Sequence, residues 1–230
     1  MCRTNNHKVN FSILFLTIIL LYSSTYFLFA ESIVVIDPGH GGVFTGCQGK
    51  QTSIFEKDIT LSIALKLKDI LTHHKIRVIL TRDADTHLDE DLIPDLLKRV
   101  AITHQHSAEI FISLHCNSNP NPNVKGYELY VPMHSECPQN SYQLAAYIHH
   151  QMSQKLDPVF AGTLGNLNTY DQGIRAARFN VLMHVQCPAV LIEMDYLTSS
   201  AAEKKLITPE FQDKIAAIIA QGIVNYLKNQ

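Results

Sequence analysis

The chain has 230 residues, with 19 basic and 21 acidic side chains, a formal net charge of −2 at pH 7 and no basic tract. This charge balance excludes the electrostatic footprint of a nucleic-acid-binding protein, so we expect no nucleic acid as a partner. The 200 residues that follow the first thirty are enough for one domain with a substantial core.

The first thirty residues have the layout of a secretory signal. Arg3 and Lys8 supply positive charge, residues 11–21 are almost wholly apolar, and Ala30 closes the segment. The apolar stretch 11–30 is also nearly long enough to span a bilayer, which leaves an uncleaved membrane anchor as an alternative. We predict a signal peptide or N-terminal anchor over residues 1–30 and a single domain over residues 31–230.

After residue 31, apolar strands alternate with helices in chain order. The strands are predicted at 33–36, 77–81, 110–114, 128–131 and 189–192, the helices at 57–71, 91–105, 141–156 and 208–228, and loops at 43–53, 117–126 and 157–171. Because the strands are apolar on both faces, the pattern predicts an α/β fold: a single domain whose mostly parallel twisted sheet carries helices on both faces.

Two of the twelve histidines directly follow predicted buried strands. His40 lies on the glycine-rich turn after strand 33–36, and His115 follows strand 110–114. Glu193 ends strand 189–192, where a carboxylate is costly unless something pairs with it, and Glu56 stands just before helix 57–71. Ligands of open α/β sheets bind at the carboxyl ends of the strands, so these four side chains are expected to converge there.

Two imidazoles, one carboxylate and a second, free carboxylate are what a hydrolytic zinc site needs. Three ligands leave a position for water, and the fourth group moves protons. The steps of 16, 59 and 78 residues between His40, Glu56, His115 and Glu193 are not diagnostic by themselves. An incidental turn histidine and an acid favoured by a helix N-terminus remain the plain alternatives for His40 and Glu56.

Six segments make the chain resemble the zinc-dependent N-acetylmuramoyl-L-alanine amidases of the type that splits septal peptidoglycan. They occur in the family's order and span nearly all of residues 32–228. The segments are Ile36–Gly42, Glu56–Leu61, Leu80–Asp83, Arg99–Ala101, Phe111–Asn117 and Pro188–Glu193. The resemblance implies that residues 31–230 are a zinc amidase catalytic domain.

The resemblance also implies roles for residues. His40, Glu56 and His115 match the family's ligands of one zinc ion, and Glu193 matches its catalytic glutamate. The substrate implied is bacterial peptidoglycan, cleaved between N-acetylmuramic acid and L-alanine in the periplasm or cell envelope. No appended wall-binding domain is visible, which leaves room for an activator or divisome protein as a partner.

Other functions and contacts remain open from the residues. A zinc peptidase acting on stem peptides would use similar groups, and a non-catalytic wall-binding module would keep the fold. Asn117 and the backbone after Gly41 are candidates for orienting the substrate. Arg82 and Arg99 either bind substrate carboxylates or brace loops under the sheet edge, and bracing is the favoured reading.

The segment after Glu193 departs from the family pattern. Asp195 adds a second acid, and Ser199 stands where the family usually has Asn. In a strand that continues past Glu193, Asp195 would share its face and could raise the pKa of Glu193. We expect instead that the chain turns there and that Asp195 is solvated.

The predicted domain contains four cysteines without metal-binding spacing, namely Cys47, Cys116, Cys137 and Cys187. After export they could form disulfides, but their order does not indicate which would pair.

Overall fold

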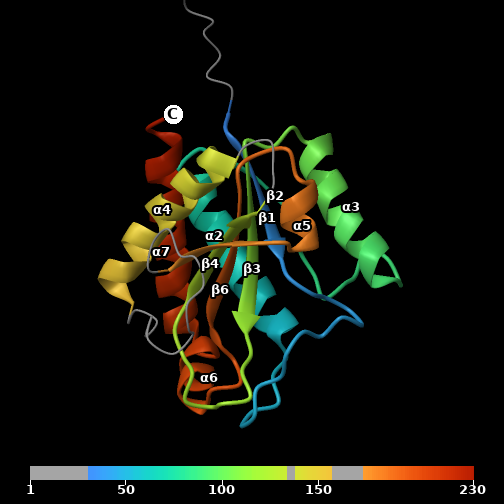
Figure 1. Ribbon diagram of the computed structural model, residues 1–230, viewed down its shortest axis with the longest axis vertical. Coiled ribbons are helices and arrows are strands. Elements are labelled where there is room, and N and C mark those ends of the chain that lie inside the picture. The colour runs from blue at the N-terminus through green and yellow to red at the C-terminus, as the bar shows by residue number, and fades with distance from the viewer. Residues whose placement is uncertain (1–30, 134–137, 157–172) are drawn as a thin grey trace, which may run out of the picture. The chain divides into compact units, whose positions relative to one another are not determined.

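The computed structural model describes residues 31–133, 138–156 and 173–230 (Figure 1). The predicted signal or anchor at 1–30 and the predicted loop at 157–171 therefore lie outside the described residues. Within the described part of the chain, no helix is long and apolar enough to cross a membrane.

The described elements alternate as the sequence predicts. In chain order they are β1 (Ile33–Pro38), α2 (Glu56–His73), β2 (Arg77–Leu80), α3 (Leu92–Gln105), β3 (Ile110–Asn117), β4 (Glu128–Pro132), α4 (Pro138–Lys155), β5 (Ile174–Ala177), α5 (Asn180–His184), β6 (Ala189–Tyr196), α6 (Ser200–Leu206) and α7 (Pro209–Leu227).

One six-stranded sheet runs through the domain in the order β2-β1-β3-β6-β4-β5. β2, β1, β3 and β6 are parallel, while β4 pairs antiparallel with β6 and parallel with β5. The predicted mostly parallel α/β sheet is confirmed. The carboxyl ends of the parallel strands lie at one edge of the sheet. His40 follows β1, His115 lies near the end of β3 and Glu193 near the end of β6, so all three are at this edge.

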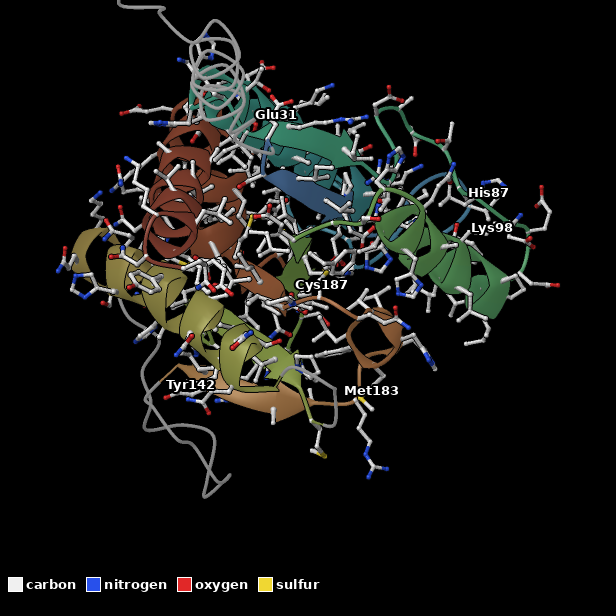
Figure 2. All side chains as sticks on the ribbon, turned by 90° about the horizontal axis from the view of Figure 1, so that it is seen from above. Glu31, His87, Lys98, Tyr142, Met183 and Cys187 are labelled. Atoms are coloured by element: carbon white, nitrogen blue, oxygen red, sulfur yellow. The ribbon has the colours of Figure 1, made fainter. Side chains whose placement is uncertain are left out.

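Helices cover both faces of the sheet, as Figures 1 and 2 show. On β1 and β3, Val34, Ile36 and Ile112 point into the larger core beneath α2, α4 and α7. The intervening Val35 and Phe111 point into a smaller core with α5. Alternation of side chains along a strand explains why these strands are apolar on both faces.

The predicted boundaries differ from the structure in ways that affect the site. The helix predicted from residue 57 begins at Glu56, so this acid belongs to the first turn of α2. β3 continues through His115 to Asn117, and β6 continues through Glu193 to Tyr196. The sequence reading missed β5, α5 and α6, which have four, five and seven residues and are too short for a clear periodic pattern.

The packing of α7 against α4 yields a test of the fold. A Cβ at Gly222 would lie 2.7 Å from the Cα of Ile148, a backbone atom that cannot rotate away. Alanine favours a helix by about 1 kcal/mol over glycine, but overpacking costs about 1–3 kcal/mol. We expect Gly222→Ala to lower the free energy of unfolding, measured by urea denaturation.

Gln221→Ala is the matched control, because Gln221 is the exposed neighbour on the same helix. A Gly222→Ala variant more stable than the wild type would contradict the close approach of the two helices.

Candidate metal centre and catalytic pocket

His40 is held in a strained turn by two buried arginines. Its φ of 65° lies in the left-handed region, which is costly for a residue with a Cβ. Arg99 donates to the carbonyls of Pro38 (3.0 Å) and His40 (2.8 Å). Arg82 donates to the carbonyls of Pro38 (2.9 Å) and Gly39 (3.0 Å). These bonds hold the backbone of the turn and so direct the imidazole of His40.

Arg82 and Arg99 are 4 % and 1 % exposed. Their guanidinium groups are used within the protein, which agrees with the bracing interpretation rather than with substrate binding. Burial and the nearby charge of Arg99 lower the pKa of Arg82 to about 10. Gly41 is similarly engaged, since its N–H donates to the carbonyl of Phe44 at 2.8 Å.

Asp37 anchors this turn to the sheet and to α3. Its carboxylate accepts hydrogen bonds from Thr81 (2.6 Å), Ser113 (2.7 Å) and Arg99 (2.8 Å), and it is 1 % exposed. Burial by itself would raise the pKa of Asp37, but the charge of Arg99 and these hydrogen bonds outweigh it and hold the pKa below 3.8. Arg99 also binds Asp95 of α3 at 2.7 Å.

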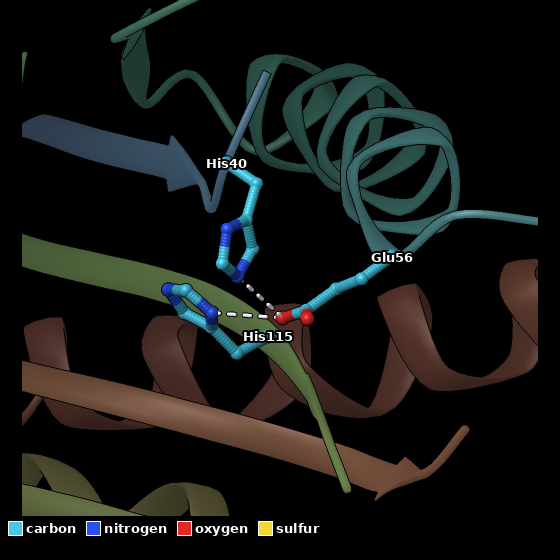
Figure 3. Close-up of side chains that lie close together, drawn as sticks. All are labelled: His40, Glu56 and His115. Atoms are coloured by element: carbon cyan, nitrogen blue, oxygen red, sulfur yellow. Dashed lines mark hydrogen bonds and ion pairs between the residues drawn. The ribbon is translucent and has the colours of Figure 1, made fainter. Parts of the chain in front are cut away.

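The carboxylate of Glu56 faces both histidines, and one of its oxygens contacts each ring (Figure 3). Its Oε1 is 3.1 Å from His40 Nε2 and 2.9 Å from His115 Nδ1, and it accepts the N–H of Cys116 at 3.0 Å. Its Oε2 accepts the N–H of Cys47 at 2.9 Å. Three segments distant in the sequence thus meet at the amino end of α2.

The electrostatics of this cluster follow from the short contacts. Burial opposes ionisation of Glu56, but hydrogen bonds from His115 and His40 outweigh it and hold its pKa well below the ordinary value. Burial alone would lower the pKa of His115, and the hydrogen bond and charge of Glu56 raise it to about 9. The cluster therefore favours an ionised carboxylate that attracts cations.

Close packing makes small residues necessary around the histidines. A Cβ at Gly39 would lie 2.4 Å from the ring of His115. At Gly46, where φ is 69°, a Cβ would lie 2.5 Å from Glu56 Oε2 and 2.8 Å from His40 Cδ2. Glycines at these two positions let the backbone approach the site closely.

Glu193 lines a cavity of about 440 Å³ together with His40, Glu56 and His115. It is the direct neighbour of His115 in the pairing of β3 with β6. Its Oε2 is buried and has no hydrogen-bond partner among the described residues. Burial raises the pKa of Glu193 to about 7; His115 opposes this shift, and the charges of Glu56 and Glu128 add to it.

The environment of Asp195 differs from both outcomes considered from the sequence. The strand does not turn at Glu193, and Asp195 is only 3 % exposed, so the expectation that it is solvated was wrong. Between the pairs His115–Glu193 and Asn117–Tyr196, β6 advances by one residue more than β3. Such a bulge disrupts the alternation of side chains along the strand.

The carboxylate of Asp195 is consequently used away from the candidate metal centre. It accepts hydrogen bonds from the N–H groups of Gly126 (2.7 Å) and Tyr196 (2.8 Å), and it pairs with Lys205 at 3.1 Å. Asp195 does not line the cavity of Glu193 and is not among the groups that shift its pKa.

A buried acid that sequence reasoning missed lies beside Glu193. Glu128 of β4 is the cross-strand partner of Glu193. Its Oε2 accepts hydrogen bonds from Asn117 Nδ2 (2.6 Å) and Tyr196 Oη (3.0 Å), and its Oε1 is 2.6 Å from Arg175. Alternation along 128–131 was the available signal, but the short strand did not indicate which face meets the site.

Asn117 lines the cavity, and the bond to Glu128 orients its amide. Cys47 and Cys116 also line the cavity, and both are free thiols. Cys137 lies outside the described residues.

The residues at the centre fit a single zinc ion. One donor atom from each of His40, Glu56 and His115 lies within 4.8 Å of the others, and they form the one such cluster found among the described residues. Two imidazole nitrogens and a carboxylate oxygen suit zinc, and three protein ligands are typical of a catalytic site.

The fold and the site define an α/β domain with a candidate catalytic metal centre at the carboxyl edge of its sheet. Residues 34–225 match the family model described as N-acetylmuramoyl-L-alanine amidase. The chain belongs to this family of hydrolases, and the resemblance inferred from the six segments is confirmed.

Individual relatives agree with this assignment. The chain is 32 % identical to N-acetylmuramoyl-L-alanine amidase AmiA of Escherichia coli, over 85 % of this chain and 76 % of the relative. Amidase AmiC2 of Nostoc punctiforme has a similar structure, with a TM-score of 0.71 and 34 % identity over 86 % of this chain and 97 % of that chain. The CwlD amidase of Clostridioides difficile, solved in complex with the GerS lipoprotein, gives a TM-score of 0.75 at 28 % identity, over 87 % and 100 % of the two chains.

The pairing of Asp37 with Arg99 predicts how stability depends on pH. Asp37→Asn removes the charge but keeps the shape, and breaking a buried pair costs about 3–5 kcal/mol. Because the folded-state pKa of Asp37 is depressed, its contribution is complete well above 3.8 and is lost as the pH falls through the folded-state value. We expect a large loss in unfolding free energy at pH 7 that shrinks toward pH 3, measured by urea denaturation across this range.

Asp83→Asn serves as the control, because Asp83 is an exposed acid in the following loop. A difference between wild type and Asp37→Asn that stays constant down to pH 3 would show that the charge of Asp37 is not what stabilises the turn.

Proposed function

We propose that this protein hydrolyses the amide bond between N-acetylmuramic acid and L-alanine in bacterial peptidoglycan. The observation that carries the proposal is the cluster of His40, Glu56 and His115 next to the unpaired, buried Oε2 of Glu193 in one cavity. Membership of the amidase family supports the choice of bond. His40 Nε2, Glu56 Oε1 and His115 Nδ1 would hold one zinc ion.

Zinc bound at such a centre polarises a carbonyl and lowers the pKa of a water molecule toward neutrality. The carboxylate of Glu193 would accept a proton from a water molecule while that water molecule attacks the lactyl carbonyl carbon. Glu193 would then donate that proton to the nitrogen of the leaving L-alanine. The carboxylate is thereby regenerated, and the protein gains and loses no proton over the reaction. Asn117, oriented by Glu128, is suited to position the substrate beside it.

The site of action proposed is the cell envelope, reached through residues 1–30 as a signal or anchor. The family's activity on peptidoglycan supports a role outside the cytoplasm. The structural relative CwlD was solved with a lipoprotein, which supports testing an activator or divisome protein as a partner of this chain.

The assignment of Glu193 is tested by Glu193→Ala. This variant is expected to retain zinc, because the three proposed ligands remain, while release of peptides from purified sacculi falls by about 10²- to 10⁴-fold. His115→Ala is the matched variant, expected to lose zinc as well as activity. Full activity of Glu193→Ala would overturn its role.

The bond that is cut is tested by digesting sacculi with and without a chelator and analysing the products by mass spectrometry. Free stem peptides with an N-terminal L-alanine are expected, and chelation is expected to abolish them. Cleavage within the stem peptide would instead identify a zinc peptidase. Zinc-free protein that stays inactive when zinc is added would favour a non-catalytic wall-binding module.

A further inference from the structure

A buried acid on α6 binds the loop between His40 and Glu56, two of the candidate zinc ligands. Glu203 of α6 is 0 % exposed. Its Oε1 accepts hydrogen bonds from the N–H of Thr52 (2.7 Å) and from Thr52 Oγ1 (2.6 Å), and its Oε2 accepts the N–H of Gln51 at 2.9 Å. These donors belong to the tip of the segment that joins His40 to Glu56.

The backbone of the loop packs directly against this carboxylate. A Cβ at Gly49 would lie 2.4 Å from Glu203 Oε1, so a larger residue there would displace the carboxylate. No Lys or Arg forms an ion pair with Glu203 in the described part of the chain. The N–H groups and the hydroxyl of the loop therefore compensate the burial of its charge.

The anchored tip is coupled to Glu56 through a short antiparallel hairpin. The N–H of Gly49 donates to the carbonyl of Ile54 at 2.9 Å, and Gln48 and Phe55 form an antiparallel β-bridge. At the base of the hairpin, the N–H of Glu56 donates to the carbonyl of Cys47 at 2.9 Å. The N–H of Cys47 in turn donates to the Oε2 of Glu56, also at 2.9 Å.

We propose that Glu203 is a positioning residue for the metal centre, which fixes the Gly49–Thr52 tip and thereby holds the carboxylate of Glu56 against His40 and His115. The inference rests on the proposed function, because it assigns Glu203 a role toward the same zinc site. Residues 50–53 carry exposed side chains, and exposed loop tips are ordinarily mobile. Glu203 removes that freedom at the point where the hairpin turns.

The placement of Glu203 also connects the strand that carries Glu193 with the loop that precedes Glu56. α6 follows β6, which carries Glu193, after a short turn in which the N–H of Leu197 donates to the carbonyl of Asn117 at 2.8 Å. One continuous segment thus presents the proposed proton carrier and, ten residues later, the anchor for the loop of a proposed zinc ligand. Groups that hydrogen-bond to a metal ligand typically change metal affinity by about 10- to 100-fold when they are removed. Glu203 reaches Glu56 only through the hairpin, so we expect an effect at the lower end of that range.

The test measures zinc affinity directly, by competition with a chromogenic chelator. Glu203→Gln and Thr52→Val are each expected to weaken zinc binding by roughly tenfold. The visible absorption of the cobalt-substituted protein is expected to change in both, because the carboxylate of Glu56 no longer has a fixed position. Thr52→Ser keeps the hydroxyl and is expected to behave like the wild type.

Glu210→Gln, at an exposed acid on α7, controls for a general effect of removing charge. Thermal unfolding of the metal-free proteins separates loss of fold from loss of positioning. If Glu203→Gln fails to fold, Thr52→Val decides the question, because Thr52 is exposed. Wild-type zinc affinity and an unchanged cobalt spectrum in a folded Thr52→Val variant would overturn the proposal.

The outcomes also separate this inference from the proposed function. If the wild type binds zinc, His115→Ala does not, and each of Glu203→Gln and Thr52→Val that folds binds zinc as the wild type does, only the role of Glu203 fails. If the wild type itself binds no zinc, the proposed function fails and the role of Glu203 fails with it.

Discussion

The ion pair between Asp37 and Arg99 is the interaction on which the rest of the site depends. It lies at the end of β1, where Asp37 also binds Thr81 after β2 and Ser113 of β3. Three neighbouring parallel strands and α3 are therefore held at one point. A buried ion pair is costly unless its remaining hydrogen bonds are satisfied, and here the free donors of Arg99 reach the carbonyls of the turn that bears His40.

This arrangement explains how the protein maintains a strained residue at its centre. The left-handed conformation of His40 costs on the order of 1–3 kcal/mol and persists only if the surroundings determine it. Two arginines from separate elements bind the carbonyls of three successive residues, so the turn has little freedom to relax. The same bonds give the guanidinium groups of Arg82 and Arg99 partners within the protein, which agrees with a bracing role.

Negative charge accumulates where a cation would be useful. Three largely buried acids lie around one end of β3, β6 and β4, namely Glu56, Glu193 and Glu128. Arg175 pairs with Glu128. Repulsion from Glu56 and Glu128 adds to the effect of burial in raising the pKa of Glu193. A divalent cation bound by the histidines and Glu56 would relieve this repulsion, which is a physical reason for acids to be gathered here.

The sequence by itself determined the fold class and the group of residues that meet. Apolar strands alternating with helices require a covered parallel sheet, and His40, His115 and Glu193 then reach its carboxyl edge. Only the tertiary structure decided which atoms face one another, that Glu203 holds the loop before Glu56, and that Asp195 is buried away from Glu193. The reason is that side-chain direction in β6 depends on its pairing with β3, and a one-residue bulge between strands distant in the sequence leaves no local pattern.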